Sequence, residues 1–346
     1  MERFAIWAGA ILVPLILWEL VETMIIPRTV MRPGRFTTLF YRTVGLFKVH
    51  VIHRLPHCGL KETLLAAFGP VSLLLLVSLW AFGITVGFAA IHWGVGTRFE
   101  GFSHHPSFNT YLYYSGTSLF TLGLGDLAPV TSPGRGLSVL ESGLGLGLFA
   151  AVVSYLPTLY QAFSAREATI VRLENRCGGT IDGLALVSRY LKHGDVEGLA
   201  SELRSFEEWT AQLLETTESY PMLAFYRSQH SDRSWVGALV AGLDACAVLR
   251  LPATPTWPPR LSDQAEVSYS MAKRALDTLS ATLRRNVDPE ARRRLDYGLA
   301  KRCLSLTGVV FDDDIANERA LDGYVAEYEP QAIALARYLA LELPEV

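Results

Sequence analysis

Cysteine is scarce in this sequence and is not arranged in pairs. The four cysteines among 346 residues are far apart and form no C-x-x-C spacing: Cys58, Cys177, Cys246 and Cys303. This spacing argues against a disulfide framework or a zinc motif, and it favours reduced structural thiols. The second half also lacks a G-x-G-x-x-G loop after a strand and any nucleophile–base or metal constellation. We therefore expect neither an α/β regulatory domain that binds nucleotide or calcium nor an enzyme.

Charged residues are scarce in the first half of the chain. Residues 1–163 carry 10 basic and 7 acidic side chains, whereas residues 164–346 carry 21 basic and 27 acidic ones. Half of all residues are hydrophobic, and the mean hydropathy is +0.24. These values are high for a soluble protein and modest for a purely membrane-embedded one. The segregation of charge predicts a membrane half joined to a soluble half.

Three apolar segments reach the length of about 20 residues that a membrane-spanning helix needs. They cover residues 4–26, 64–93 and 133–163. We interpret the first as an uncleaved anchor, because it contains Glu19 and Glu22 and has no clear small-x-small cleavage site. These two carboxylates are expected either to be solvated at the helix end or to partner the basic segment that follows. The first span has no arginine repeat at three-residue spacing, so no voltage sensor is expected.

The segment between the first two spans is basic. It has no acidic residue between Thr23 and Lys61, and its basic residues are Arg28, Arg32, Arg35, Arg42, Lys48, Arg54 and Lys61. Since cytoplasmic loops are rich in Lys and Arg, this segment is predicted to be cytoplasmic. The N-terminus would then lie outside the cell membrane, and residues 165–346 would lie in the cytoplasm.

Apolar residues recur at helical spacing within this basic segment, at Phe36, Leu39, Phe40, Val44, Phe47 and Val51. The pattern predicts an amphipathic helix on the inner leaflet. Mechanical coupling, binding of anionic lipid and a passive interfacial linker all remain open as its role.

Residues 121–126 read TLGLGD and lie between the second and third spans. Glycine adopts the φ > 0 conformations that turn successive carbonyl oxygens toward one axis, and such oxygens can replace the water shell of K+. The apolar stretch 108–120 before them predicts a helix too short to span the membrane. A re-entrant segment accommodates that length. After the hexapeptide come Pro129, Val130 and Thr131.

In the order outer helix, pore helix, filter and inner helix, residues 65–165 resemble the potassium channel pore family. The family string is usually TVGYGD, then two residues, then Pro, Val and Thr, as here. The resemblance implies a selectivity filter that coordinates K+ at Thr121, Leu122, Gly123 and Leu124, with Gly125 completing the stretch. Because one chain carries one pore loop, it also implies a homotetramer around a shared axis. The expected partners are K+ and membrane lipid, with no nucleic acid and no cofactor besides the permeant ion.

Several neighbouring residues are predicted to support the filter. Tyr113 and Tyr114 match the paired aromatics of the family's pore helix. Asp126 is expected to support the filter from behind and to add negative potential outside it. Glu141 lies inside the third span, where an ionisable group is costly. The alternatives for Glu141 are that it supports the filter from behind, that it remains protonated, or that it is wet near the external end of the span.

The third span carries the candidate gate. Gly145 matches the hinge-like glycine of the family's inner helix. Phe149 and Val153 are one helical turn apart and are candidates for the cavity lining. Pro157 is a candidate bend, because proline removes a backbone hydrogen bond and clashes with the preceding turn. The bend of voltage-gated relatives lies about one turn earlier.

At two positions the sequence departs from the family's pattern, and these departures leave open alternatives to a potassium-selective channel. Leu124 replaces the usual Tyr, although a GLG filter is similar to the second pore loop of some two-pore-domain potassium channels. Phe120 stands where the family usually has Thr, and it is expected to narrow or dry the cavity. The alternatives are a weakly selective cation channel and a non-conducting membrane scaffold or sensor that acts through its cytoplasmic domain.

Residues 165–346 predict an all-α cytoplasmic bundle. Helix-like apolar spacing occurs at 181–193, 196–218, 234–249, 262–285, 288–304 and 313–342, with a proline-rich break at 251–259. Asp312, Asp313 and Asp314 are typical of an acidic helix start. The predicted fold is an α-helical membrane protein with a potassium-channel-like pore domain and a re-entrant pore loop. Its predicted parts are a transmembrane helix at 1–27, a basic linker at 28–61, the pore domain at 62–164 and the bundle at 165–346.

Overall fold

The structure is a computed structural model. It describes residues 2–24, 26, 36–47, 59–101, 106–228, 233–282, 287–291, 295–311, 313–339, 341 and 343. Within these ranges β-type pairing is limited to two isolated bridges, Phe99–Pro129 and Thr254–Val310. The protein is therefore an all-α membrane protein, which confirms the predicted fold class.

In the described part of the chain, three helices are long and apolar enough to cross a membrane, and they coincide with the predicted spans. They are α1 (Glu2–Met24), α3 (Gly59–Val95) and α5 (Ser132–Cys177). Contacts divide the chain into two compact units, and the division falls between Leu46 and Phe47, within α3 and within α5. Unit 1 comprises Met1–Leu46 and Pro70–Tyr160, and unit 2 comprises Phe47–Gly69 and Gln161–Val346.

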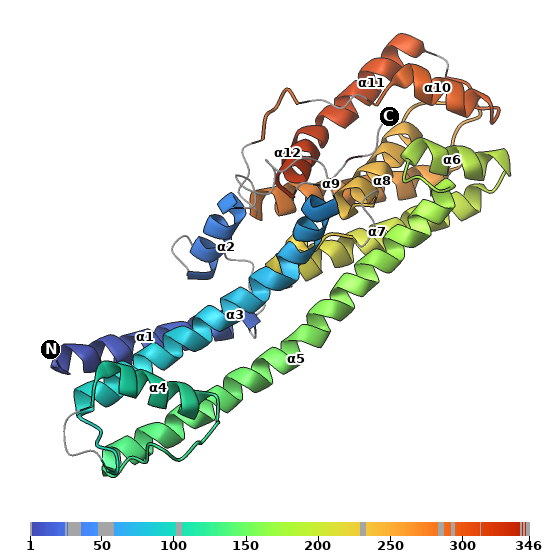
Figure 1. The fold of residues 1–346 in the computed structure, drawn as a ribbon. Coiled ribbons are helices and arrows are strands. Elements are labelled where there is room, and N and C mark those ends of the chain that lie inside the picture. The colour runs from blue at the N-terminus through green and yellow to red at the C-terminus, as the bar shows by residue number, and fades with distance from the viewer. Residues whose placement is uncertain are drawn as a thin grey trace. The chain divides into compact units, whose positions relative to one another are not determined.

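In unit 1, α1 packs antiparallel to α3 over a row of glycines (Figure 1). A Cβ atom on Gly9 would collide with the Gly87 carbonyl oxygen, and one on Gly94 would collide with Ile6 and the backbone of Glu2. Small residues let helix backbones approach closely, and this close packing drives helix association in lipid. Along α1 a stripe of large apolar side chains is exposed, as a lipid-facing surface requires: Phe4, Trp7, Ile11, Leu15 and Trp18.

The predicted amphipathic helix is present as α2 (Phe36–Phe47). Glu19 of α1 holds its first turn, because the carboxylate accepts hydrogen bonds from Phe36 N at 3.1 Å and Thr37 Oγ1 at 2.8 Å. A carboxylate at a helix N-terminus satisfies unpaired N–H groups and is favoured by the helix dipole. Glu19 thus partners the segment that follows it, which was one of the two expectations. The predicted helix positions Lys48, Val51 and Arg54, like Cys58, lie outside the described residues.

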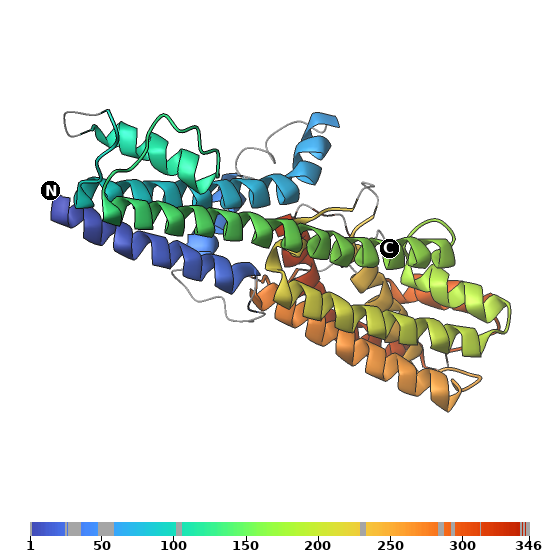
Figure 2. The same ribbon diagram turned by 90° about the horizontal axis from the view of Figure 1, so that it is seen from below.

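Helix α8 (Trp235–Leu249) is the buried centre of unit 2. All 15 of its residues are buried, and this length is too short for a membrane span. It contacts α6 (Gly183–Lys192), α7 (Val196–Ser219), α9 (Pro259–Thr282), α11 (Asp314–Ala326) and α12 (Glu329–Leu339). Asp244 within α8 is hydrogen-bonded by the Tyr328 hydroxyl, so this buried polar group has a partner. Figure 2 shows α7 and α9 side by side along this unit.

Side-chain caps start five helices of unit 2. An Asp or Ser side chain accepts a backbone N–H of the first turn in each case: Asp182 for α6, Asp195 for α7, Ser234 for α8, Asp296 for α10 (Tyr297–Ser305) and Asp313 for α11. Such caps satisfy donors that the helix itself leaves unpaired. The acidic helix start predicted at 312–314 is confirmed for Asp313 and Asp314, whereas Asp312 lies outside the described residues.

Two predicted helical runs differ from the structure. The run predicted at 288–304 begins only at Tyr297, because the Asp288 side chain accepts Glu290 N in a local turn ahead of it. The run predicted at 313–342 is two helices, α11 and α12, separated at Glu327 and Tyr328. Proline favours the first turn of a helix. Pro330 in the first turn of α12 therefore starts a new helix instead of continuing the old one.

Candidate ion pathway

The predicted pore helix is α4 (Phe108–Leu119), and the chain runs from it directly into residues 121–126, here called the filter segment. Thr121 N donates to Ser118 O at 3.0 Å, and Leu122 N donates to Thr117 O at 2.8 Å. The start of the filter segment is thus hydrogen-bonded to the last turn of α4. Because the C-terminal end of a helix carries partial negative charge, a cation is favoured there.

Left-handed backbone torsions recur at every second residue of the filter segment. The φ angles of Thr121, Gly123 and Gly125 are 53°, 55° and 81°, and Thr121 is the one non-glycine residue with positive φ in the described part of the chain. A Cβ atom added to Gly123 or Gly125 would meet nothing within 4 Å. Glycine is therefore required there by the backbone conformation and not by space. Alternating torsions of this kind turn successive carbonyls to one side.

The filter segment is exposed in the single chain, and so is the residue before it. The side chains of Phe120, Leu122 and Leu124 are 60%, 62% and 62% exposed. Contiguous exposed apolar side chains usually mark a surface that another molecule covers. These three side chains are therefore a candidate contact surface for another molecule.

The predicted support residues take different partners. The Tyr113 hydroxyl donates to Oδ2 of Asp126 at 2.9 Å, which links α4 to the outer end of the filter segment. Tyr114 instead pairs through its hydroxyl with Ser138 of α5. The structure thus brings Tyr113 to the filter segment but directs Tyr114 to the inner helix. A further bond joins these helices, because Ser142 Oγ donates to Ser118 O at 3.1 Å.

Glu141 is fully buried, which contradicts the expectation that it is wet. Its Oε2 lies 3.5 Å from Nε2 of His92 on α3, and His92 is equally buried. His92 is not among the predicted site residues. A lone histidine inside the apolar segment 64–93 was the available signal, but its partner on another helix could not be seen from the sequence.

Along α5 the gate candidates fall in different environments. A Cβ atom on Gly145 would collide with the carbonyl oxygen of Leu119, so this glycine allows α5 to approach the end of α4. Phe149 and Val153 are exposed, and they belong to a stripe with helical spacing that also contains Leu146, Leu156 and Tyr160. The helix α5 continues through Pro157. A hinge at Gly145, a bend at Pro157 and a cavity lining at Phe149 and Val153 remain predictions.

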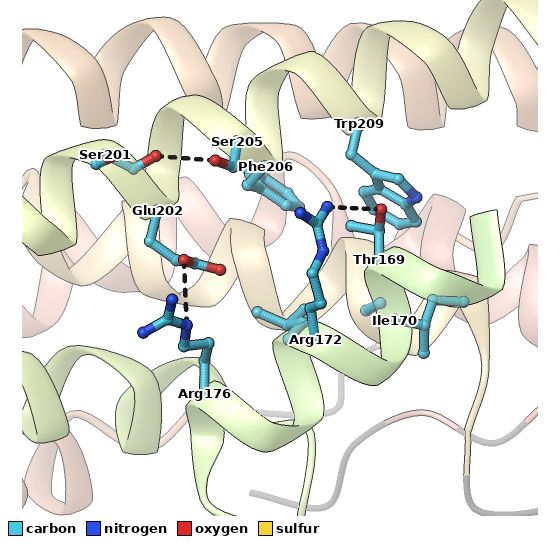
Figure 3. A pocket seen from close by; sticks show the side chains of 11 residues that line it. Thr169, Ile170, Arg172, Arg176, Ser201, Glu202, Ser205, Phe206 and Trp209 are labelled. Carbon is cyan, nitrogen blue, oxygen red and sulfur yellow. Dashed lines mark hydrogen bonds and ion pairs between the residues drawn. The ribbon is translucent and has the colours of Figure 1, made fainter. Parts of the chain in front are cut away.

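A separate groove of about 180 Å³ lies in unit 2 between α5 and α7 (Figure 3). Arg176 Nε lies 3.7 Å from Oε2 of Glu202, and Arg172 Nη2 donates to Oγ1 of Thr169 at 3.0 Å. These two arginine side chains thus bond to other residues that line the groove. Among the described residues, no cluster of three or more His, Cys, Asp or Glu side chains could hold a metal ion.

Comparison with known proteins agrees with this geometry. Residues 74–162 match the family model Ion_trans_2, described as "Ion channel". The match includes α4, the filter segment and α5 as far as residue 162, so it falls on the residues that form the candidate pathway. It indicates an ion channel, and not an enzyme.

A curated relative, the uncharacterized membrane protein YdjJ of Bacillus subtilis (strain 168), is 26% identical over 188 residues. The aligned part covers 53% of this chain and 53% of the relative, so the chain spans about half the length of the curated relative it matches. No solved structure matches the chain.

Proposed function

We propose that the protein is a potassium-selective channel through which K+ permeates passively. The filter segment is the single observation that carries this proposal. Its alternating left-handed torsions at Thr121, Gly123 and Gly125 provide a row of backbone carbonyls that can replace the hydration shell of K+. The hydroxyl of Thr121 can add to this row, and the C-terminal end of α4 favours a cation beside it.

We propose further that four chains assemble around the filter axis. One chain supplies one row of carbonyls, and a closed symmetric ring supplies a complete cage. The exposed side chains of Leu122 and Leu124 support this assembly, because neighbouring subunits would cover them. The exposed stripe at Phe149 and Val153 would then face the cavity or a neighbouring subunit.

The orientation follows from the distribution of charge. Basic residues between α1 and α3 place that segment in the cytoplasm of a cell-membrane protein. The N-terminus is then outside, and residues 165–346 are cytoplasmic. The antiparallel packing of α1 on α3 is compatible with this topology.

Leu124 supports a second candidate function, a weakly selective cation channel. Its side chain is exposed and cannot donate a hydrogen bond, so it cannot hold the filter as the usual tyrosine does. A filter with fewer side-chain restraints can adjust its width and accept Na+.

Flux from liposomes that contain the purified full-length protein tests these proposals. Gly123→Ala places a side chain at a φ of 55°, which costs roughly 1–2 kcal/mol and distorts the carbonyl row. Gly136→Ala is the matched control, because it lies within α5 where an added Cβ atom meets nothing. We expect K+ flux with the wild type and with Gly136→Ala, little Na+ flux, and loss of K+ flux with Gly123→Ala.

Other outcomes separate the alternatives. Comparable Na+ and K+ flux from the wild type would support the weakly selective channel. Absence of flux under all gradients, or a monomer after chemical cross-linking in the bilayer, would reject the channel proposal in favour of a scaffold or sensor. Equal flux from both glycine variants would remove the filter segment from the pathway.

A further inference from the structure

Two ionisable side chains are buried together where α3, α4 and α5 meet. Glu141 and His92 have no exposed surface, and Oε2 of Glu141 lies 3.5 Å from Nε2 of His92. Both lie in helices that are long and apolar enough to cross a membrane. Ionisable groups are costly in such a setting unless they have partners, and those found there usually serve a function.

The His92 end of this buried pair is fixed to the loop after α3. The imidazole Nδ1 lies 2.9 Å from Oγ1 of Thr97, and the backbone carbonyl of Thr97 accepts the Tyr111 hydroxyl at 2.8 Å. The His92 ring also packs edge-on against the ring of Tyr114, with centroids 5.3 Å apart. Tyr111 and Tyr114 belong to α4, so the orientation of the imidazole depends on the position of the pore helix.

The Glu141 end faces the same helix from the other side of the pair. Ser115 of α4 is fully buried and lies close to the Glu141 carboxyl. One turn before Glu141 on α5, Ser138 bonds the hydroxyl of Tyr114. One residue after Glu141, Ser142 bonds the backbone of Ser118 near the start of the filter segment. The pair therefore lies within the set of contacts that locates α4.

The number of protons that the two side chains hold distinguishes this pair from two residues that merely pack together. A neutral imidazole with a protonated carboxyl, and an imidazolium with a carboxylate, are both neutral overall and hold one proton. Adding or removing a proton leaves a net charge in a dry site, which is strongly unfavourable. A site that holds one proton between the two side chains therefore carries no net charge.

We propose that His92 and Glu141 act as a one-proton pair that positions the pore helix and thereby the filter segment. The proposal deepens the channel function proposed above and rests on it. His92 and Glu141 are positioning residues, because neither is part of the carbonyl row. Other titratable groups facing this region are Tyr111 and Tyr114 of α4 and Glu2 of α1, which acts electrostatically on Tyr111.

Single substitutions should give pH profiles of opposite sign. His92→Gln leaves a lone buried carboxyl that is neutral only when protonated, so K+ flux should fall as pH rises. Glu141→Gln leaves a lone buried imidazole that is neutral only when deprotonated, so flux should fall as pH decreases. A single proton limits each slope to about tenfold per pH unit. We would measure liposome flux with equal pH on both sides, between about pH 5.5 and 8.5, where free tyrosine and glutamate do not titrate.

Two further variants complete the set. The double variant His92→Gln with Glu141→Gln has no titratable group in the site and should show a flat profile like the wild type. Glu100→Gln removes an exposed carboxyl near the end of α3 and serves as the control. Equal profiles for the two single variants, or flat ones, would reduce the pair to a packing role and overturn the proposal.

Melting temperatures in detergent, over the same pH range, test the pair without any need for conduction. Stability should fall with rising pH for His92→Gln and with falling pH for Glu141→Gln, and the double variant should restore a flat curve. If wild-type liposomes pass no ions, the channel function fails while these curves still decide on the pair. If flux is normal but the two single variants show the same dependence of melting temperature on pH, the proposed role of the pair is rejected and the channel function is retained.

Discussion

In the filter segment the side chains are exposed and the backbone is left-handed at Thr121, Gly123 and Gly125. In α8 every side chain is buried and the backbone is a regular helix. In the proposed channel the first region would supply carbonyl groups to the ion, whereas the second supplies apolar surface to the core of unit 2. The proposed function thus depends on torsion angles in one segment, and stability depends on packing in the other.

This difference predicts that substitutions in the filter segment should change ion preference, whereas substitutions in α8 should change stability. Within the filter segment a substitution alters torsion angles and should affect which ions pass, with little loss of folded protein. Within α8 a substitution leaves a cavity and should reduce stability without changing ion preference, because no residue of α8 lies in the candidate pathway. A variant in either region that changed both ion preference and stability would contradict this division of roles.

The largest effect is expected for Leu243→Ala at the centre of α8. The Leu243 side chain is fully buried, and removing it leaves a cavity among well-packed neighbours. Such truncations cost about 2–5 kcal/mol of unfolding free energy. Thermal or denaturant unfolding in detergent would measure the loss, and the ratio of K+ to Na+ flux from the protein that remains folded should equal that of the wild type.

Leu306→Ala is the control for this truncation. The Leu306 side chain is 78% exposed, so the same chemical change should alter stability by less than about 0.5 kcal/mol. Equal losses for Leu243→Ala and Leu306→Ala would show that burial in α8 does not determine the stability of this unit.

A smaller effect is expected for Tyr113→Phe, which removes the hydrogen bond from α4 to Asp126. A bond of this kind contributes about 0.5–1.5 kcal/mol, so the intact filter should lose a few-fold in population. We expect a reduced ratio of K+ to Na+ flux and little change in melting temperature. Tyr114→Phe makes the same chemical change on the next residue, but the lost partner is Ser138 of α5. A larger loss of selectivity in Tyr114→Phe than in Tyr113→Phe would contradict the assignment of filter support.

The sequence was sufficient to predict the elements whose signals are local. Helix α8 was predicted at 234–249 because its apolar residues have helix-like spacing ahead of the proline-rich break. The filter segment was predicted because its two glycines stand between a short and a long apolar helix. The amphipathic helix α2 followed from the spacing of its aromatic residues. In each case residues within a few turns of each other determine the backbone.

Features that depend on contacts between distant residues were not predictable in the same way. The pairing of His92 with Glu141 joins two helices separated by the whole pore loop, so no local pattern marks it. The hinge at Gly145 stays a prediction, and the close approach of the Leu119 carbonyl that its missing side chain allows could not be seen from the sequence.

The smallest expected effect concerns an exposed ion pair of unit 2. This pair belongs neither to the filter segment nor to α8. Lys301 Nζ lies 2.6 Å from both carboxylate oxygens of Asp314, and the Tyr297 hydroxyl donates to Asp314 at 2.9 Å. The Lys301 ammonium, followed by the Tyr297 hydroxyl, lowers the pKa of Asp314 below its ordinary value of 3.8. A lowered pKa means that the folded state binds this proton less readily than the unfolded state does. The resulting stability is therefore present above about pH 4 and is lost as pH falls through the folded-state pKa.

Asp314→Asn should lower the melting temperature slightly at neutral pH, and its difference from the wild type should shrink below about pH 4. Asp322→Asn, at an exposed position on the same helix, controls for the general effect of acid. A difference between wild type and Asp314→Asn that stays constant from neutral to acid pH would show that the ion pair does not stabilise unit 2.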